Sequence, residues 1–170
     1  LIPVLVLVNQ GNGRLEVDPC IFAECEVPTT REMYLPKIAD FNGDDVDDFL
    51  TVPLHDLASP VLLLSSQEGL QNKSESFAKI LADFQFENAD LNGHTFAVGD
   101  LNNDGAIDLY VPDYIRNVDA PCSSTRPGCM GLTLLNDGKG NFSLGSVDFP
   151  FTGNVWGSDI HDFDGDGYGD

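Results

Sequence analysis

Three short acidic segments recur at nearly constant spacing along this chain of 170 residues. They read DFNGDDVDD from residue 40, DLNNDGAID from residue 100 and DFDGDGYGD from residue 162, so their first residues lie 60 and 62 positions apart. Each segment carries Asp or Asn at positions 1, 3, 5 and 9. A repeat that keeps its phase constrains the fold strongly, because each copy marks the same place in a recurring structural unit.

The spacing of these oxygen-bearing side chains predicts a cation site in each segment, and we call the segments the first, second and third Asp loops (40–48, 100–108 and 162–170). Calcium takes about 6–8 oxygen ligands, which short side chains at positions 1, 3, 5 and 9 and the backbone carbonyl of position 7 can supply. Magnesium fits less well because it usually keeps several waters. The alternative is a set of solvated acidic turns, since Asp, Asn and Gly are ordinary turn residues. Up to three calcium ions are expected, with the ligands Asp40, Asn42, Asp44, Val46 and Asp48; Asp100, Asn102, Asp104, Ala106 and Asp108; and Asp162, Asp164, Asp166, Tyr168 and Asp170.

Position 6 of each Asp loop is expected to turn sharply with a positive φ. Gly105 and Gly167 suit that conformation, because glycine adopts it without steric cost. Asp45 occupies the same position in the first Asp loop, where it fits less well, although Asp tolerates the left-handed region better than most residues. The first Asp loop is therefore expected to be the least secure of the three sites.

The flanking sequences favour β-strands over the helices of an EF-hand. Position 12, where an EF-hand needs Glu, is Thr51 in the first repeat and Val111 in the second. TFAVGD and IDLYVPDY, on the two sides of the second Asp loop, are rich in β-branched and aromatic residues. Further strands are expected at 48–54, 60–66 and near 70–77, and hairpins at 3–17 and 131–145.

The recurring unit is thus strand, Asp loop, strand, strand, turn and strand, with a period of about 60 residues. Four antiparallel strands per repeat are what a β-propeller blade requires. We therefore expect an all-β chain, with half a blade over 1–33, blades over 34–88 and 89–150, and the start of another over 151–170. Because propellers close with roughly 4–8 blades, this incomplete circle is expected to be a piece of a longer protein.

The blocks IADFNGDDVDDFL, FAVGDLNNDGAIDLYV and DIHDFDGDGYGD resemble the calcium loops of FG-GAP/VCBS repeats. The hairpins LVNQGNGRLEV and LLNDGKGNFSLG resemble the outer half of a blade in that family. The family forms the β-propellers of integrin α-subunit heads, several extracellular lectins and cartilage-acidic-protein-like secreted proteins. The resemblance implies a calcium-binding propeller that acts outside the cell in adhesion or protein interaction.

The charge balance excludes several classes of partner. Eight Lys and Arg residues face 28 Asp and Glu residues, which gives a net charge of −20. With no basic patch to displace counterions from phosphates, nucleic-acid binding is excluded. Anionic membranes would repel such a surface, and the apolar opening LIPVLVLV is too short to cross a bilayer.

Cysteine spacing and two sequons point to an extracellular setting, secreted or as part of an ectodomain. The four cysteines form two close pairs, Cys20 with Cys25 and Cys122 with Cys129, and local disulfides are the favoured of three connectivities. Four free buried thiols are the alternative. Asn72-Lys-Ser and Asn141-Phe-Ser are candidate glycosylation sites.

No catalytic motif accompanies these features, so we do not expect an enzyme. The favoured function is a calcium-rigidified module for protein interaction, adhesion or assembly, with the irregular stretch 115–130 as candidate partner surface and further propeller blades as neighbours. One alternative is a lectin-type propeller, in which Trp156 could stack on a sugar. The other is an accessory propeller of an extracellular lyase or phospholipase.

Overall fold

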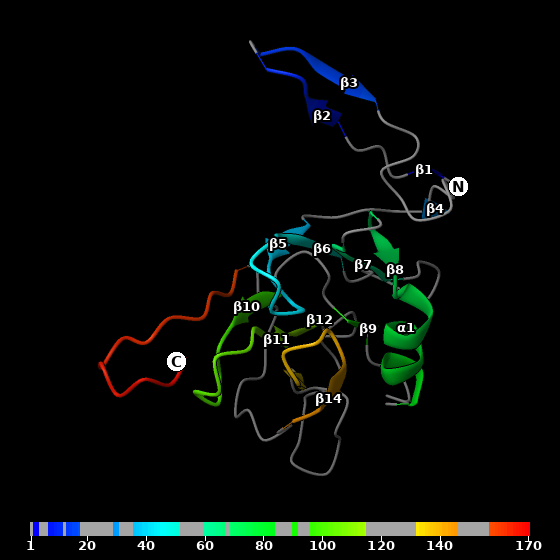
Figure 1. Ribbon diagram of the computed structural model, residues 1–170. Helices are drawn as coiled ribbons and strands as arrows, with labels where there is room; N and C mark the ends of the chain where they lie inside the picture. The colour runs from blue at the N-terminus through cyan, green and yellow to red at the C-terminus, as the bar shows by residue number, and fades with distance from the viewer. Residues whose placement is uncertain are drawn as a thin grey trace.

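A computed structural model describes the chain over residues 2–3, 7–11, 13–17, 29–30, 36–51, 60–66, 69–83, 90–91, 96–114, 132–145 and 157–170. In these ranges the protein is built mostly from antiparallel β-sheets, with one α-helix packed beside them (Figure 1). The expectation of a β fold is thereby confirmed at the level of antiparallel sheets. No helix in the described ranges is long and apolar enough to cross a membrane.

The first four-stranded sheet contains the first Asp loop. Its strands β5 (Lys37–Ala39), β6 (Asp48–Thr51), β7 (Val61–Leu64) and β8 (Gln71–Asn72) are neighbours in chain order. The Asp loop joins β5 to β6, whose register pairs Ala39 with Asp48. The loop therefore closes directly on the last pair of the ladder.

The second four-stranded sheet repeats this arrangement around the second Asp loop. It contains β10 (Ala97–Gly99), β11 (Asp108–Val111), β13 (Leu132–Asn136) and β14 (Phe142–Leu144), again in chain order. The Asp loop joins β10 to β11, and Gly99 pairs with Asp108. Both sheets thus place an Asp loop at the same end of their first strand pair.

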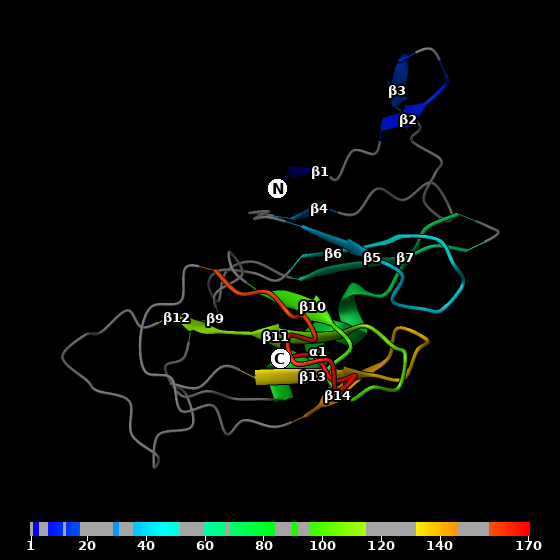
Figure 2. The ribbon, with the colours of Figure 1, turned by 90° about the vertical axis from the view of Figure 1, so that its left-hand side faces the viewer.

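Three two-stranded sheets complete the described β structure. They pair β1 (Ile2–Pro3) with β4 (Thr29–Thr30), β2 (Leu7–Asn9) with β3 (Leu15–Val17), and β9 (Asp90–Leu91) with β12 (Asp113–Tyr114). The β2–β3 hairpin stands apart from the four-stranded sheets in both views (Figures 1 and 2). Its side chains Leu7, Leu15 and Val17 are about half exposed.

The two four-stranded sheets share one hydrophobic core. The ring of Phe142 in β14 makes edge-to-face contacts with Phe41 of the first Asp loop, at 6.1 Å between centroids, and with Phe77, at 5.3 Å. Phe41 anchors the first Asp loop because its side chain is fully buried in this core. The core consists of Phe41, Leu50, Leu62, Leu64, Phe77, Phe96, Leu109, Val111, Leu132, Leu134 and Phe142.

A helix replaces most of the strand expected near 70–77. Strand β8 covers only Gln71–Asn72, and α1 (Ser74–Asp83) follows. The backbone N–H of Ser74 donates to Asn72 Oδ1 at 3.0 Å, so the first N–H group of the helix has a partner. Phe77 and Ile80, three residues apart, both pack on the core. That spacing suits a helical face and not the alternation of a strand, which is why the sequence expectation was wrong here.

Candidate metal sites

The three Asp loops adopt the same backbone conformation. Positions 4 and 6 have positive φ in every copy: Gly43 and Asp45 at 76° and 63°, Asn103 and Gly105 at 58° and 85°, and Gly165 and Gly167 at 80° and 94°. Asp45 and Asn103 are the non-glycine residues with positive φ in the described part of the chain. The sequence predicted this requirement at position 6 but not at position 4. The first Asp loop keeps the shared conformation although Asp45 stands where the others have glycine.

The carboxylate at position 1 organises each Asp loop by accepting backbone hydrogen bonds from positions 5 and 6. The paired distances from those two nitrogens are 3.2 and 2.8 Å to Asp40, 3.2 and 2.8 Å to Asp100, and 3.1 and 2.9 Å to Asp162. Partial burial acts to raise the pKa of Asp40, but backbone N–H groups from residues 42–45 outweigh it and the pKa is lowered. The conformation of the first Asp loop therefore favours the charged form of Asp40.

Positions 3 and 5 continue the same network in all three copies. Oδ1 of position 3 accepts the N–H of position 5, and Oδ1 of position 5 accepts the N–H of position 7. The first contact measures 3.0, 3.1 and 3.1 Å and the second 2.9, 2.8 and 2.9 Å along the chain. Three segments about 60 residues apart thus share these contacts at positions 1, 3 and 5.

Position 9 fastens each of the first two Asp loops to its own sheet. Asp48 and Asp108 are 1% and 0% exposed. One oxygen of each accepts the N–H of position 2 in its loop, at 2.8 Å from Phe41 and 3.0 Å from Leu101. The other accepts an N–H from the third strand region of the sheet, Ser65 at 2.6 Å or Asn136 at 2.8 Å.

Burial raises the pKa of both Asp48 and Asp108 although these backbone groups oppose the shift. Nearby acidic residues add to it, Asp44 for Asp48, and Asp104 and Asp100 for Asp108. In the third Asp loop, Asp170 Oδ2 likewise accepts the N–H of Phe163, at 3.0 Å. Asp48 and Asp108 are therefore structural carboxylates, and the role of position 9 as a metal ligand stays a prediction.

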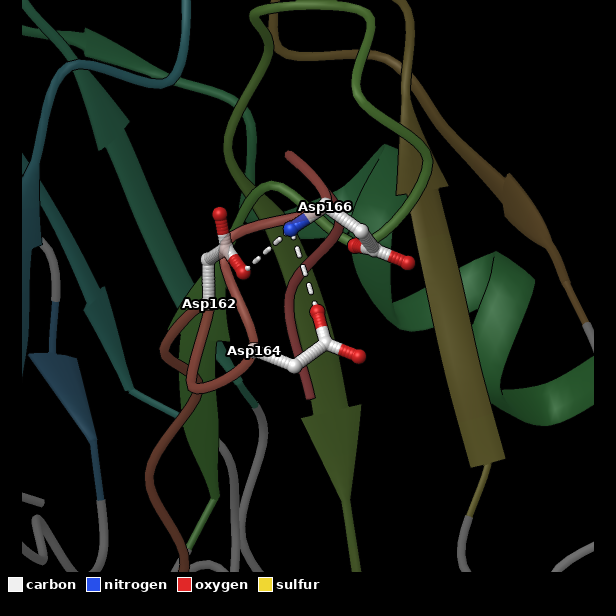
Figure 3. Close-up of side chains that lie close together, drawn as sticks. All are labelled: Asp162, Asp164 and Asp166. Atoms are coloured by element: carbon white, nitrogen blue, oxygen red, sulfur yellow. Dashed lines mark hydrogen bonds between the residues drawn. The ribbon is translucent and has the colours of Figure 1, made fainter.

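The third Asp loop brings three carboxylates together at the surface (Figure 3). Asp162, Asp164 and Asp166 each offer an oxygen, and these oxygens lie within 4.8 Å of one another. The N–H of Asp166 donates to Asp162 Oδ1 and Asp164 Oδ1, both at 3.1 Å, and so holds the two side chains toward the same point. These three carboxylates could hold a metal ion, since carboxylate oxygens are ligands for hard cations.

The first two Asp loops differ from the third at position 3, where Asn replaces Asp. Asn102 Nδ2 donates to Asp104 Oδ2 at 2.8 Å, and Asn42 Nδ2 approaches Asp44 Oδ2 at 3.3 Å. The hydroxyl of Ser65 also donates to Asp44, at 2.9 Å to Oδ2. Amide and hydroxyl donors thus offset part of the negative charge in these two loops, whereas the third presents carboxylates alone.

The remaining site residues have a simpler account. The position-7 residues Val46, Ala106 and Tyr168 donate their N–H groups to the carboxylate of position 5, and their role as carbonyl ligands of a metal stays a prediction. Both sequon asparagines, Asn72 and Asn141, are exposed. The disulfide pairs Cys20–Cys25 and Cys122–Cys129, the stretch 115–130 and Trp156 lie outside the residues that the structure describes.

Position 6 gives a direct test of the loop conformation. We expect Gly105→Ala to lower the free energy of unfolding by about 1–2 kcal/mol, because φ is +85° and the left-handed region penalises a Cβ. Gly157→Ala is the matched control, since a Cβ at either glycine meets no atom within 4 Å and only Gly105 has a positive φ. Urea unfolding of both variants measures the difference. Equal losses would show that the left-handed backbone is not the cause.

Sequence reasoning missed two residues beside the Asp loops, Ser65 and Asn136. Each donates its backbone N–H to the position-9 carboxylate of its own sheet. The signal available in the sequence was their common place at the end of the third strand segment, in VLLLSS and LTLLN.

Comparison with known proteins leaves the geometry of the Asp loops as the main guide to function. No protein-family model, no curated protein and no solved structure matches the chain.

Proposed function

We propose that this chain is a calcium-stabilised segment of a β-propeller of the FG-GAP/VCBS type, serving protein interaction, adhesion or assembly outside the cell. One observation carries the proposal: three segments in phase along the sequence have the same backbone conformation and the same network of carboxylate-to-backbone hydrogen bonds. Independent acidic turns have no reason to agree at that level of detail.

The arrangement of the sheets supports the propeller part of the proposal. Both four-stranded sheets run in chain order and place their Asp loop after the first strand. They pack on a common core, as adjacent blades would. The exposed side chains Leu7, Leu15 and Val17 on the β2–β3 hairpin, and Phe163 on the third Asp loop, would then be surfaces on which further blades pack.

The donor set supports calcium as the ion. The side chains at positions 1, 3, 5 and 9 supply only carboxylate and amide groups, and such oxygens suit a hard cation. Asp162, Asp164 and Asp166 would hold the ion in the third Asp loop, and the equivalent residues of the other two loops would do the same there. Bound calcium would supply positive charge that offsets the repulsion among these side chains.

Terbium luminescence tests the calcium site of the third Asp loop. Tyr168 at position 7 should sensitise a terbium ion bound there, and calcium should displace that ion at far lower concentration than magnesium. We expect Asp166→Asn to weaken binding at least tenfold, because it removes one of three clustered charges.

The matched control is Asp159→Asn, which alters an exposed carboxylate just before the loop and should leave binding unchanged. If magnesium displaced terbium as well as calcium does, the calcium assignment would be overturned. Unchanged terbium binding in Asp166→Asn would overturn it too.

A further inference from the structure

Asn136, at the end of β13, links two Asp loops that belong to different sheets. Its side chain is 3% exposed. Asn136 Nδ2 donates to the carbonyl of Phe41 in the first Asp loop at 2.8 Å and to the carbonyl of Ile107 in the second at 3.1 Å. One buried amide group therefore connects backbone atoms that lie on either side of the boundary between the sheets.

The orientation of this amide is fixed by its other contacts. Asn136 Oδ1 accepts the backbone N–H groups of Gly138 and Gly140, both at 3.2 Å. With two N–H donors on its oxygen and two carbonyls on its nitrogen, only one orientation of the amide satisfies all four contacts. The tight turn after β13 thus positions the amide group toward both loops.

The hydrogen bonds of Asn136 connect the structural carboxylates of the two loops. Phe41, whose carbonyl accepts from Asn136, donates its own N–H to Asp48. On the other side, the backbone N–H of Asn136 donates to Asp108. An unbroken series of buried contacts therefore runs from Asp48 through Phe41 and Asn136 to Asp108.

The surroundings agree with a close mechanical link. The first and second Asp loops and the turn after β13 together line a cavity of about 330 Å³. A Cβ added to Gly43 would lie 3.0 Å from the carbonyl oxygen of Gly138, so the first loop touches the turn of the second sheet directly. The turn that follows Asn136 therefore lies close to the first Asp loop.

Ser65 is the residue of the first sheet that corresponds to Asn136, and its side chain does not link two Asp loops. It occupies the place of Asn136 in the first sheet, since its N–H donates to Asp48 as that of Asn136 does to Asp108. Its hydroxyl donates to Asp44 and to the carbonyl of Val46, both in the Asp loop of its own sheet. The sheet thus tolerates serine at this position, and the link between loops comes from the longer amide side chain of Asn136.

We propose that Asn136 couples the first and second Asp loops, so that calcium binding in one raises the affinity of the other. This inference rests on the proposed function, because it concerns regulation of the same sites. Its physical basis is that ordering either loop fixes a carbonyl, that of Phe41 or of Ile107, to which the single amide group must bond. Coupling between sites in proteins typically amounts to about 5–150-fold in affinity.

Calorimetric titration of calcium into the whole chain tests the coupling. Every protein in this titration carries Asp166→Asn, which disables the third Asp loop, so that only the first two Asp loops bind calcium. Disabling the second loop as well, with Asp104→Asn, should lower the calcium affinity of the first by on the order of tenfold. The same comparison in an Asn136→Ser background should show a much smaller loss. The cycle removes the direct electrostatic effect of Asp104, which is common to both backgrounds.

Asn141→Ser is the matched control, because its amide bonds to Asp137 within the same turn, at 2.9 Å, and reaches neither loop. It should preserve the tenfold effect. Amide hydrogen exchange without calcium gives a second measurement: Asn136→Ser should speed exchange at Asp44 and Asp45, and Asn141→Ser should not. Asn136→Ala also lacks the Nδ2 donor, so it should give the same results as Asn136→Ser.

The outcomes separate this inference from the proposed function. If Asp104→Asn lowered the calcium affinity of the first loop equally in the Asn136 and Asn136→Ser backgrounds, the coupling would be overturned. The calcium sites themselves would not be affected by that result. Absence of calcium uptake by the unaltered chain would overturn the proposed function and the coupling together.

Discussion

Removing calcium with EDTA should lower the melting temperature of the chain by about 5–10 °C for each ion lost. A ligand present at 100 times its dissociation constant stabilises the folded state by about 2.7 kcal/mol per site. For a chain of this size, 1 kcal/mol corresponds to roughly 2–4 °C in melting temperature. With three Asp loops occupied, the total should be well beyond the error of differential scanning calorimetry.

Adding back excess calcium should restore the original melting temperature, and adding back magnesium should restore little of it. The third Asp loop should account for the largest share, because its three carboxylates have no amide donor among them to offset their charge. An identical melt in calcium and in chelator would mean that the loops are held by their hydrogen bonds alone.

Asp108→Ala should lower the free energy of unfolding by about 2–6 kcal/mol, whether or not calcium is present. The carboxylate is fully buried and accepts the backbone N–H groups of Leu101 and Asn136. Its loss would leave both groups without a partner, and each buried unsatisfied group costs about 1–3 kcal/mol. Urea unfolding at fixed pH, with and without chelator, measures the change.

Asp47→Ala is the control, since Asp47 is an exposed residue at position 8 of the first Asp loop and should change stability by no more than about 0.5 kcal/mol. Asp104→Ala should behave differently from both, with a larger loss in calcium than in chelator. If Asp108→Ala cost no more than Asp47→Ala, the assignment of position 9 as a buried anchor would be wrong.

The sequence predicted those parts of the structure whose contacts lie between residues close together in the chain. Turn residues and apolar residues identify the strands on either side of the first two Asp loops and the hairpin of β13 and β14, because the paired residues lie 13 or fewer positions apart (Lys37 with Leu50, Ala97 with Tyr110, Leu134 with Leu144). The helix α1 was missed for a local reason as well: the run SESFAKIL is short, and its apolar residues can be read as strand or as helix.

The contacts that join the sheets could not be read from the chain. Phe41 and Asn136 are 95 residues apart, and no pattern in either segment predicts that the two residues form a hydrogen bond. The burial of Asp48 and Asp108 was hidden for the same reason, since it arises from packing between strands and not from the pattern of the loop. Sequence reasoning assigned positions 1, 3, 5 and 9 one common role as metal ligands, and it did not predict that Asp48 and Asp108 are buried and bond to two backbone N–H groups each.

Equilibrium dialysis against calcium, with the bound metal counted per folded chain, tests the central claim most directly. We expect three ions at saturation, falling to two when Asp166→Asn disables the third Asp loop. A folded chain that retains no calcium at millimolar concentration would contradict the claim that these loops are metal sites.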